Sequence, residues 1–293
     1  MKKLLLLLSI SALFYNCSSD DDNNNDTPST NNYFPINAAN TWSYTGTASS
    51  TSSFNGTNVI SGNTYNKFLH PENVFGFIGD YVNVRKEGNN YYLTGNLNLN
   101  GDIITAENQK FMNDGATAGQ TINESTFVRV MEPTPVNISY FNGTATNTIT
   151  YKTVIKLDSK STTATFGGHS YNDVAKVIWT FYVKVDTQIQ GNLLALGQVI
   201  ALDSQTHHLV NETSLGTLTQ NFANNIGAVH TVMNLDGSGV QFNNSAVIAL
   251  PSSVGGGTIT VDISPFTASI QQQINDYQYS SEYNLGTYNV VNP

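Results

Sequence analysis

The chain has 293 residues, a single cysteine and a formal net charge of −9. One cysteine excludes an internal disulfide framework, and the acidic balance argues against nucleic-acid binding, because that binding needs Lys and Arg to neutralise phosphates. A chain of this size can bury about three-quarters of its unfolded surface, so a hydrophobic core alone can hold it together.

The first sixteen residues have the features of a secretion signal. Lys2 and Lys3 precede an apolar run from Leu4 to Tyr15 that is interrupted by Ser9 and Ser11. A helix of about a dozen residues rises roughly 18 Å, which is too short to span a hydrocarbon core of roughly 30 Å. We therefore predict a signal peptide over residues 1–16. Its removal takes away two lysines and gives a net charge of −11 (−9 − 2).

The only cysteine, Cys17, follows this segment directly. The order of basic residues, apolar run and cysteine resembles the lipobox of bacterial lipoproteins, although Tyr15 and Asn16 stand where small residues are usual. The residues after it are similar to the acidic export signal of Bacteroidetes surface lipoproteins: Ser18, Ser19, Asp20, Asp21 and Asp22. The resemblance implies lipidation of Cys17 by the lipoprotein maturation machinery, followed by export. We therefore expect an outer-membrane protein held by acyl chains and exposed at the cell surface.

A polar segment separates the cysteine from the rest of the chain. Residues 17–32 are rich in Ser, Asp, Asn, Thr and Pro and contain no large apolar side chain that could offset the entropy of ordering. We predict a flexible tether over 17–32 and a β-rich domain over 33–293, with a possible internal division near 133–137.

Alternation of apolar and polar residues dominates that domain. The run 149–157 alternates cleanly, 177–185 is rich in β-branched and aromatic residues, and shorter runs lie at 81–85 and 91–94. Residues typical of tight hairpins occur along the chain at Asn55-Gly56, Glu87-Gly88-Asn89, Asn100-Gly101, Asn142-Gly143 and Asp236-Gly237. We therefore predict an all-β, mainly antiparallel fold, as a sandwich or a curved open sheet.

Helical periodicity is strongest near the C-terminus. Ser264 can cap a helix and Pro265 suits its first turn. The apolar residues that follow recur at spacings of four, four and three: Phe266, Ile270, Ile274 and Tyr277. We predict one short helix there. A weaker helical pattern over 188–202 is interrupted by two glycines.

Two segments 106 residues apart resemble each other. Residues 60–68 and 166–174 share a glycine, a Ser or Thr two residues later, and then Tyr-Asn. The match predicts a turn that leads into a strand whose tyrosine packs inward, and it raises two alternatives: a duplicated β unit or a chance match.

Further segments carry a resemblance to a family. Tyr33-Phe34-Pro35-Ile36 followed by Asn40-Thr41-Trp42-Ser43-Tyr44 resembles the opening of many uncharacterised Bacteroidetes lipoproteins, with Ala39 in place of their usual glycine. Residues 222–229 are similar to a later stretch of the same proteins. The resemblance implies a β-rich surface or periplasmic domain and brings no catalytic residues.

Motifs for catalysis or metal binding are weak. The histidines lie at His70, His169, His207-His208 and His230, without the spacing of a zinc site. The segment 168–172 has the form of a nucleophile elbow but ends in Asn, and a strand-turn-helix context is missing. We therefore name no catalytic or metal-binding residue and expect no cofactor. A carboxylate pair stays open because its separation depends on the fold; the acids considered are Glu72, Asp80, Glu107, Asp114, Glu124, Glu132 and Glu212.

Tyrosines near the C-terminus give the one indication of binding: Tyr277, Tyr279, Tyr283 and Tyr288. Such rings combine an apolar face with a polar tip, and they can either recognise a ligand or fill a core. The leading hypothesis is a non-enzymatic surface protein that binds a glycan or a protein partner. The alternatives are a glycan-degrading or other hydrolytic enzyme, and a periplasm-facing structural or transport-accessory lipoprotein.

Overall fold

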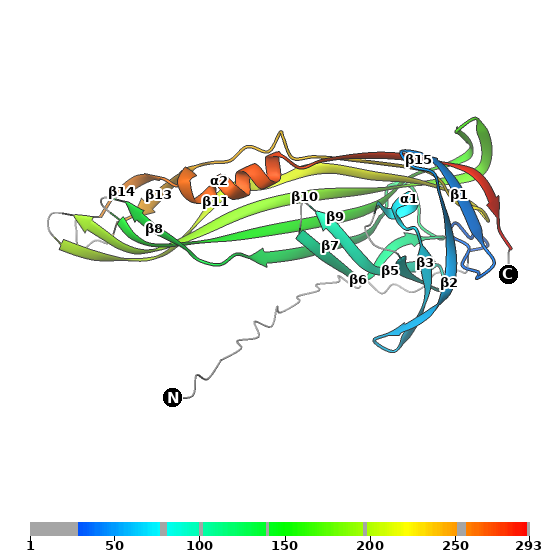
Figure 1. Ribbon diagram of the computed structural model, residues 1–293, viewed down its shortest axis with the longest axis horizontal. Coiled ribbons are helices and arrows are strands. Elements are labelled where there is room, and N and C mark those ends of the chain that lie inside the picture. The colour runs from blue at the N-terminus through cyan, green and yellow to red at the C-terminus, as the bar shows by residue number, and fades with distance from the viewer. Residues whose placement is uncertain are drawn as a thin grey trace.

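The computed structural model describes residues 29–76, 81–99, 102–138, 141–195, 198–250 and 256–291. Antiparallel strands make up most of the described chain, and the elongated arrangement is shown in Figure 1. The strands are β1 Thr41–Gly46, β2 Ser50–Ile60, β3 Asn63–Leu69, β4 Tyr81–Glu87, β5 Asn90–Leu99, β6 Asp102–Asn113, β7 Thr121–Val130, β8 Thr134–Ile138, β9 Phe141–Phe166, β10 His169–Ala195, β11 Gln198–Ala223, β12 Gly227–Asp236, β13 Ser245–Ala249, β14 Thr258–Asp262 and β15 Gln278–Asn289. The helices are α1 Glu72–Phe75 and α2 Ser264–Asn275.

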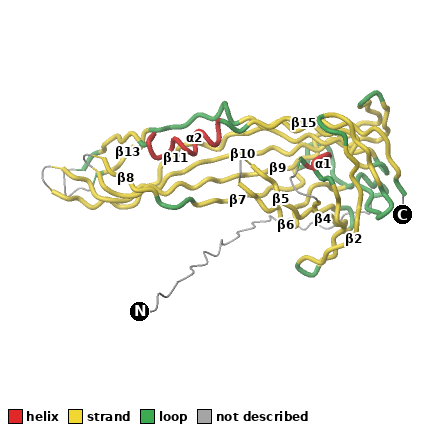
Figure 2. Tube along the Cα trace, viewed as in Figure 1, coloured by secondary structure: helices red, strands yellow, loops and turns green. Residues whose placement is uncertain are grey.

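One 13-stranded sheet organises the molecule. Its order is β6-β5-β4-β3-β2-β1-β15-β12-β11-β10-β9-β7, with β8 pairing with β9 beyond the end of β7. The last strand, β15, lies between β1 and β12 and so joins the N-terminal strands to the rest. Figure 2 shows the strands in yellow along the whole length of the molecule. A separate two-stranded ribbon is formed by β13 and β14. The prediction of an all-β, mainly antiparallel fold with one short helix near the C-terminus is confirmed. Of the two predicted architectures, the structure has the curved open sheet.

Residues from distant strands bring the two edges of this sheet together. Asp102, at the start of β6, is buried and forms an ion pair with Arg129 on β7. Its other oxygen accepts a hydrogen bond from the Tyr151 hydroxyl on β9, at 2.8 Å. Burial raises the pKa of Tyr151 to about 12, which keeps its proton available for this bond. The sheet therefore curls until its outermost strands meet.

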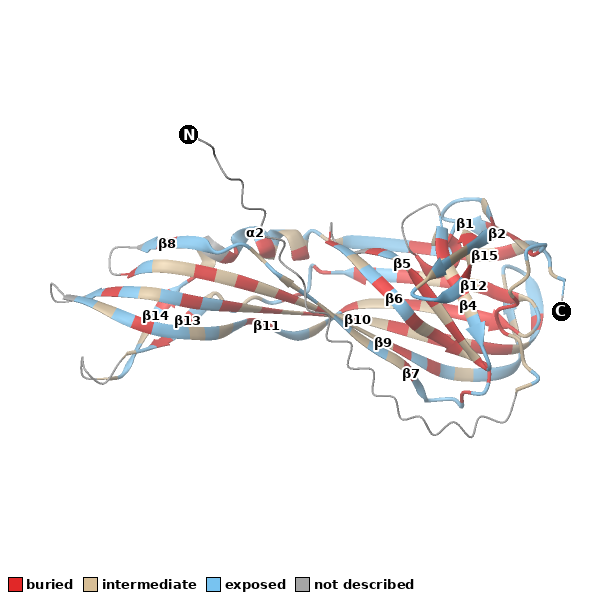
Figure 3. Ribbon diagram, turned by 90° about the horizontal axis from the view of Figure 1, so that it is seen from below, coloured by how far each residue is buried: buried red, intermediate tan, exposed pale blue. Residues whose placement is uncertain are grey.

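The three long strands β9, β10 and β11 run the length of the molecule and connect two different regions (Figures 1 and 3). At the wide end, β1–β6, β12 and β15 surround an aromatic core. The arm is the narrower region where β8, β13, β14 and α2 accompany the long strands. Its described residues are 134–138, 141–148, 186–195, 198–210, 243–250 and 256–275.

The aromatic core of the wide end is centred on Phe34. This ring stacks on Trp42 at a centroid distance of 6.1 Å and an interplanar angle of 7°. It also makes edge contacts with rings from β2, β3, α1, β5, β6 and β11: Phe54, Phe68, Phe75, Tyr91, Phe111 and Phe222. Such edge contacts add to the stabilisation that comes from burial alone. The first residues of the domain thus seal its core.

The predicted hairpin signals have mixed outcomes. Gly88 and Asn89 form the turn between β4 and β5, as predicted. Asn55-Gly56 lies inside β2 at a shift of register between Phe54 and Thr57, so that prediction of a hairpin is wrong and the glycine serves a bulge. Asp236-Gly237 ends β12, but β12 pairs with β11 and β15 and makes no hairpin with β13. The pair at 100–101 lies outside the described residues.

Asn142-Gly143 is also not a hairpin, because it lies within β9. Gly143 pairs with Gly191 of β10, and a side chain on either residue would collide with the opposite backbone and with the Phe141 ring. These glycines therefore allow close approach of two strands beneath an aromatic ring. Gly191 also interrupts the weak helical pattern over 188–202, which the structure shows to be the paired ends of β10 and β11.

The C-terminal helix is α2, with Pro265 in its first turn as predicted. The capping prediction is wrong in detail: the carboxylate of Asp262 accepts the Ser264 N–H at 2.9 Å, and Ser264 is already helical. Ile270 and Ile274 are buried, as expected from their spacing. The side chain of Phe266 lies outside the described residues.

The two similar segments form the same local structure. Both make two-residue hairpin turns in which Ser61-Gly62 and Gly167-Gly168 have positive φ. The tyrosine that follows is buried in each case, as predicted: Tyr65 and Tyr171. The strands that flank the turns differ greatly in length, so the likeness is confined to the turn and the start of the next strand.

Candidate functional site

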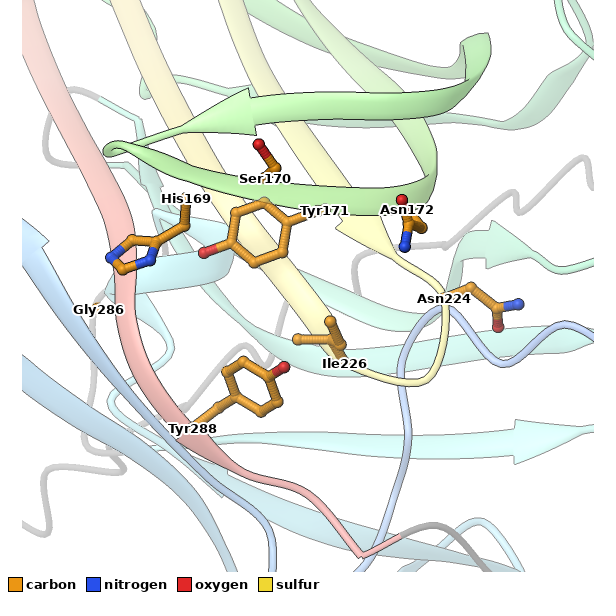
Figure 4. A pocket seen from close by; sticks show the side chains of 8 residues that line it. All are labelled: His169, Ser170, Tyr171, Asn172, Asn224, Ile226, Gly286 and Tyr288. Carbon is orange, nitrogen blue, oxygen red and sulfur yellow. The ribbon is translucent and has the colours of Figure 1, made fainter.

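A polar cleft of about 360 Å³ lies at the wide end, where β10, the β11–β12 turn and β15 meet (Figure 4). Its described lining residues are His169, Ser170, Tyr171, Asn172, Asn224, Ile226, Gly286 and Tyr288. None of these carries a formal charge when histidine is neutral. The cleft therefore offers hydroxyl groups, amides and aromatic faces to a ligand.

Core residues fix the β11–β12 turn that forms one wall of the cleft. Trp42 donates its indole N–H to the carbonyl oxygen of Ile226 at 2.5 Å. Gly227 next to it has a φ of +112°, and a Cβ there would lie 2.9 Å from the indole nitrogen. Only glycine accepts both the backbone conformation and the contact. The wall thus rests directly on the aromatic core.

Asp173, just beneath the cleft, links three segments of the chain. Its φ of +49° is uncommon for a residue other than glycine. One carboxylate oxygen accepts the Tyr33 hydroxyl at 2.6 Å, and the other accepts the amide of Asn224 at 2.9 Å. Burial raises the pKa of Tyr33 well above its usual range, and the hydrogen bond to Asp173 raises it further. These bonds hold the side chain of Asn224 at the cleft.

Residues 29–32, which we call the strap, cross the wide end beside the cleft. The N–H of Ser29 donates to Asn89 Oδ1 at 3.0 Å. Asn32 donates its N–H to Asn224 Oδ1 at 2.8 Å, and its carbonyl oxygen accepts the Asn225 N–H at 2.9 Å. The last four residues of the predicted tether are therefore hydrogen-bonded to the domain, and residues 17–28 lie outside the described residues.

An adjoining hollow of about 320 Å³ extends the cleft along β9 and β10. It shares Asn172 with the cleft and is also lined by Lys160, Ser161, Thr162 and Asp173. The Lys160 ammonium lies 5.3 Å from the centre of the Tyr33 ring and donates to the Asp114 carbonyl oxygen at 3.3 Å. The polar surface therefore continues from an uncharged part to a part with one lysine and one aspartate.

The structure separates the four C-terminal tyrosines that the sequence groups together. Tyr288 is 49% exposed and lines the cleft, whereas Tyr283 is buried. Tyr279 is exposed on the same strand, paired with Leu235 and away from the cleft. Tyr277 is partly buried against the core. Tyr283 therefore fills the core, Tyr288 is exposed at the cleft, and ligand recognition stays a prediction.

The remaining predicted positions add little chemistry. Cys17 and the acidic run from Ser18 to Asp22 lie outside the described residues. His230 stacks on Phe166 at 4.8 Å and approaches Glu282 at 3.1 Å. Within the described part of the chain, no group of three or more His, Cys, Asp or Glu could hold a metal ion.

The segment with the form of a nucleophile elbow lines the cleft, but in another structural context. Ser170 follows a hairpin turn and lies on β10, and its hydroxyl faces that of Thr165 at 3.2 Å. A nucleophile elbow instead places its serine between a strand and a helix. The geometry does not supply an activated serine here.

Most of the cleft was missed from the sequence. In the sequence, Tyr171 and Asn172 belong to a repeated segment, His169 also to a set of histidines without the spacing of a zinc site, and Asn224 to a family-like segment. These residues lie close together only in the folded chain. The segment 166–174 and the segment 222–229 meet the strap through hydrogen bonds of Asp173, Asn224 and Asn32.

Comparisons with models of protein families, with curated proteins and with solved structures found no match for this chain. Among the residues described, no helix combines the length and apolar character that a membrane crossing requires.

Proposed function

We propose that this protein is a lipid-anchored envelope protein, displayed at the cell surface, that binds a neutral glycan in the cleft. The lipobox-like order around Cys17 and the acidic run after it support anchoring and export. The single observation that carries the binding proposal is Tyr288, whose half-exposed ring stands among uncharged polar side chains.

The cleft combines the two kinds of contact that a sugar needs. A sugar ring has C–H groups that pack on an aromatic face, and the Tyr288 ring offers such a face. Its hydroxyl groups both donate and accept hydrogen bonds, as the side-chain amides of Asn172 and Asn224 also do. Tyr171 contributes ring surface while its hydroxyl donates to the Leu285 carbonyl oxygen at 3.3 Å.

The charge of the lining favours a neutral ligand over an acidic one. Recognition of carboxylate or phosphate groups relies on Arg, Lys or clustered N–H groups. The described lining of the cleft has no Lys or Arg, and Lys160 belongs to the adjoining hollow. A neutral oligosaccharide therefore fits this surface better.

The same residues favour binding without hydrolysis. Glycosidases use two carboxyl groups about 5–9.5 Å apart across the scissile bond. Among the described residues that line the cleft and the hollow, Asp173 is the one acid, and both of its oxygens already accept hydrogen bonds from Tyr33 and Asn224. Of the acids considered from the sequence, those that the structure describes line neither feature, and Asp80 lies outside the described residues.

An array of neutral and acidic oligosaccharides, probed with the full-length protein in mild detergent, tests the binding proposal. We expect binding to neutral members and a loss of at least about tenfold in affinity for Tyr288→Ala, equivalent to about 1.4 kcal/mol. Tyr279→Ala is the matched control, because it removes an exposed tyrosine of the same strand outside the cleft. Equal binding by wild type and Tyr288→Ala, or binding of acidic members alone, would reject the proposal.

Protease shaving of intact cells tests the location. We expect the protein to be degraded while a periplasmic control survives, and Cys17→Ser to release it from the membrane fraction. Replacement of Asp20, Asp21 and Asp22 by Ala is expected to leave it lipidated and protected from the protease. If the wild-type protein resists the protease on cells whose outer membrane is shown to be intact, the protein would instead face the periplasm.

A further inference from the structure

A lysine, an asparagine and a buried aspartate meet where the strap enters the sheet. The Lys86 Nζ lies 3.2 Å from Asn32 Oδ1 and 2.7 Å from Asp114 Oδ2. The Tyr91 hydroxyl lies 2.8 Å from the same Asn32 oxygen and 2.9 Å from the same Asp114 oxygen. We propose that Lys86 and Asn32 join in an intramolecular isopeptide bond, promoted by Asp114 and Tyr91, with release of ammonia.

The fold holds each partner in place from a different element. Lys86 on β4 and Tyr91 on β5 are direct neighbours across the hairpin, and Asp114 follows the end of β6. Asn32 is fixed by backbone hydrogen bonds on both sides, to Asn224 and from Asn225. Because the reacting groups are positioned before reaction, the entropy cost that slows amine–amide condensation in water is already met by folding.

Asp114 is placed to accept and return protons. Its side chain is 1% exposed, and Oδ1 accepts the Tyr33 N–H at 3.0 Å, which leaves Oδ2 facing Lys86. The Lys86 side chain is 32% exposed, and its ammonium lies 4.6 Å from the centre of the Tyr91 ring. An ordinary ion pair would account for Lys86 and Asp114. It would not account for an amide oxygen held against the same nitrogen by a phenol.

The reaction needs no reagent from outside. Lys86 first gives a proton to Asp114 and becomes a neutral amine. Its lone pair then attacks Asn32 Cγ, and the carbonyl electron pair moves to Oδ1, where the Tyr91 hydroxyl donates to the developing oxyanion. Asp114 gives its proton to Asn32 Nδ2 and takes one from Lys86 Nζ. The C–N bond to Nδ2 breaks as the carbonyl re-forms, and ammonia leaves and takes up the remaining proton.

The bond would fasten the start of the domain to its sheet. Asn32 lies at the end of the strap, 54 residues before Lys86, on the side of the chain that leads to the predicted anchor. A pull on the N-terminal end would then reach β4 through a covalent bond instead of peeling the hydrogen-bonded strap from the surface. The inference does not depend on what the cleft binds.

Peptide mapping of the full-length protein tests the bond. After denaturation in urea and digestion with two proteases, we expect a branched peptide that joins Asn32 to Lys86 and weighs one ammonia less than its two parts. Trypsin is expected to leave the chain uncut after Lys86. Recovery of Lys86 and Asn32 in unlinked, unmodified peptides from folded protein would overturn the proposal.

Matched variants separate this bond from other losses of ammonia. Lys86→Arg keeps the positive charge beside Asp114 and is expected to abolish the branched peptide, whereas Lys160→Arg, which changes the other lysine of the cluster, is expected to retain it. A loss of ammonia that persists in Lys86→Arg would instead come from succinimide formation, for example at an Asn-Gly pair, and would count against the proposal.

Variants of Asp114 and Tyr91 test whether these two side chains promote the bond. Asp114→Asn is expected to leave both reactants free and unlinked. Tyr91→Phe keeps the ring and should slow bond formation after synthesis of the chain by about a hundredfold, the size of effect expected when one oxyanion donor is removed. Full linkage at the wild-type rate in Tyr91→Phe, measured by sampling peptides over time, would show that the phenol plays no part and would contradict the assigned role.

Discussion

The wide end and the arm share the strands β9, β10 and β11, yet they are packed differently. At the wide end, rings from seven elements surround Phe34, which belongs to the segment before β1. In the arm, the buried residues are mostly aliphatic, among them Ile189, Leu193 and Ile248, and of the side chains described there Phe141 is the one large ring that is fully buried. Each aromatic ring buries a large area, so we expect the wide end to be the more stable region.

The features on which the proposals rest also lie at the wide end. The cleft, the strap and the cluster around Asp114 all belong to the wide end, where hydrogen bonds run from the surface into the aromatic core. At the tip of the arm, Leu194 and Val199 are 44% and 70% exposed. We infer that the wide end is rigid and carries a preformed cleft, and that the thinner arm extends from it.

The largest effect should follow from removing the centre of the aromatic core. Phe34→Ala is expected to lower the free energy of unfolding by about 3–5 kcal/mol, because it leaves a cavity among the surrounding rings. Urea unfolding followed by tryptophan fluorescence measures it, since Trp42 stacks on Phe34. Val59→Ala, at a residue 74% exposed in the same end, should change stability by less than about 0.5 kcal/mol.

A smaller effect should follow from the same kind of change in the arm. Ile189→Ala removes a buried side chain of β10, and we expect a loss of about 2 kcal/mol, at the lower limit for such truncations. Limited proteolysis should locate the damage, with new cleavage confined to the arm. A loss equal to that of Phe34→Ala would mean that the two cores contribute alike, and the comparison would fail. Val199→Ala serves as the exposed control.

The smallest effect should be a dependence on pH that originates in the arm. His207 is half-buried on β11, and within the described structure its Nε2 has no hydrogen-bond partner. Burial lowers the pKa of His207 below its ordinary 6.5, and the neighbouring His208 lowers it further. Protonation therefore favours the unfolded chain, so this stability is present above pH 6.5 and is lost as the pH falls.

Urea midpoints at about pH 8 and about pH 5 check this dependence. The wild type should be less stable at the lower value, and His207→Gln should lose part of that difference. Asp186 pairs with Lys184 and His208. Burial raises the pKa of Asp186, but these two partners lower it by more, so the pKa lies below its usual range. Its contribution should therefore persist until much lower pH. An unchanged difference in His207→Gln would assign the effect to other groups.

Local pattern predicted the class of fold well. Alternation marked β4, β5 and parts of β9 and β10, and the spacing of Ile270 and Ile274 marked α2. The failures came from glycine, which has several uses. Asn55-Gly56 serves a bulge and Asn142-Gly143 a close approach of two strands, and both uses depend on residues of another strand. Sequence pattern alone does not contain that information.

The cleft could be predicted only in part for the same reason. The sequence groups Tyr288 with three other tyrosines as binding or core aromatics, but only Tyr288 lines the cleft, because each position depends on how β15 sits between β1 and β12. Asp114 was named only as one acid among several. Its contact with Lys86, which also contacts Asn32, brings together residues from three parts of the chain. No local spacing in the sequence predicts this contact.

Hydrogen–deuterium exchange of the full-length protein tests most directly the claim that a rigid wide end carries the cleft. We expect the amides of β1, β12 and β15 to exchange only through global unfolding, and the paired amides of residues 186–195 and 198–208 to exchange faster through local opening of the arm. Equal protection at both ends, or faster exchange in the strands around the cleft, would contradict the division between a rigid end and an extended arm.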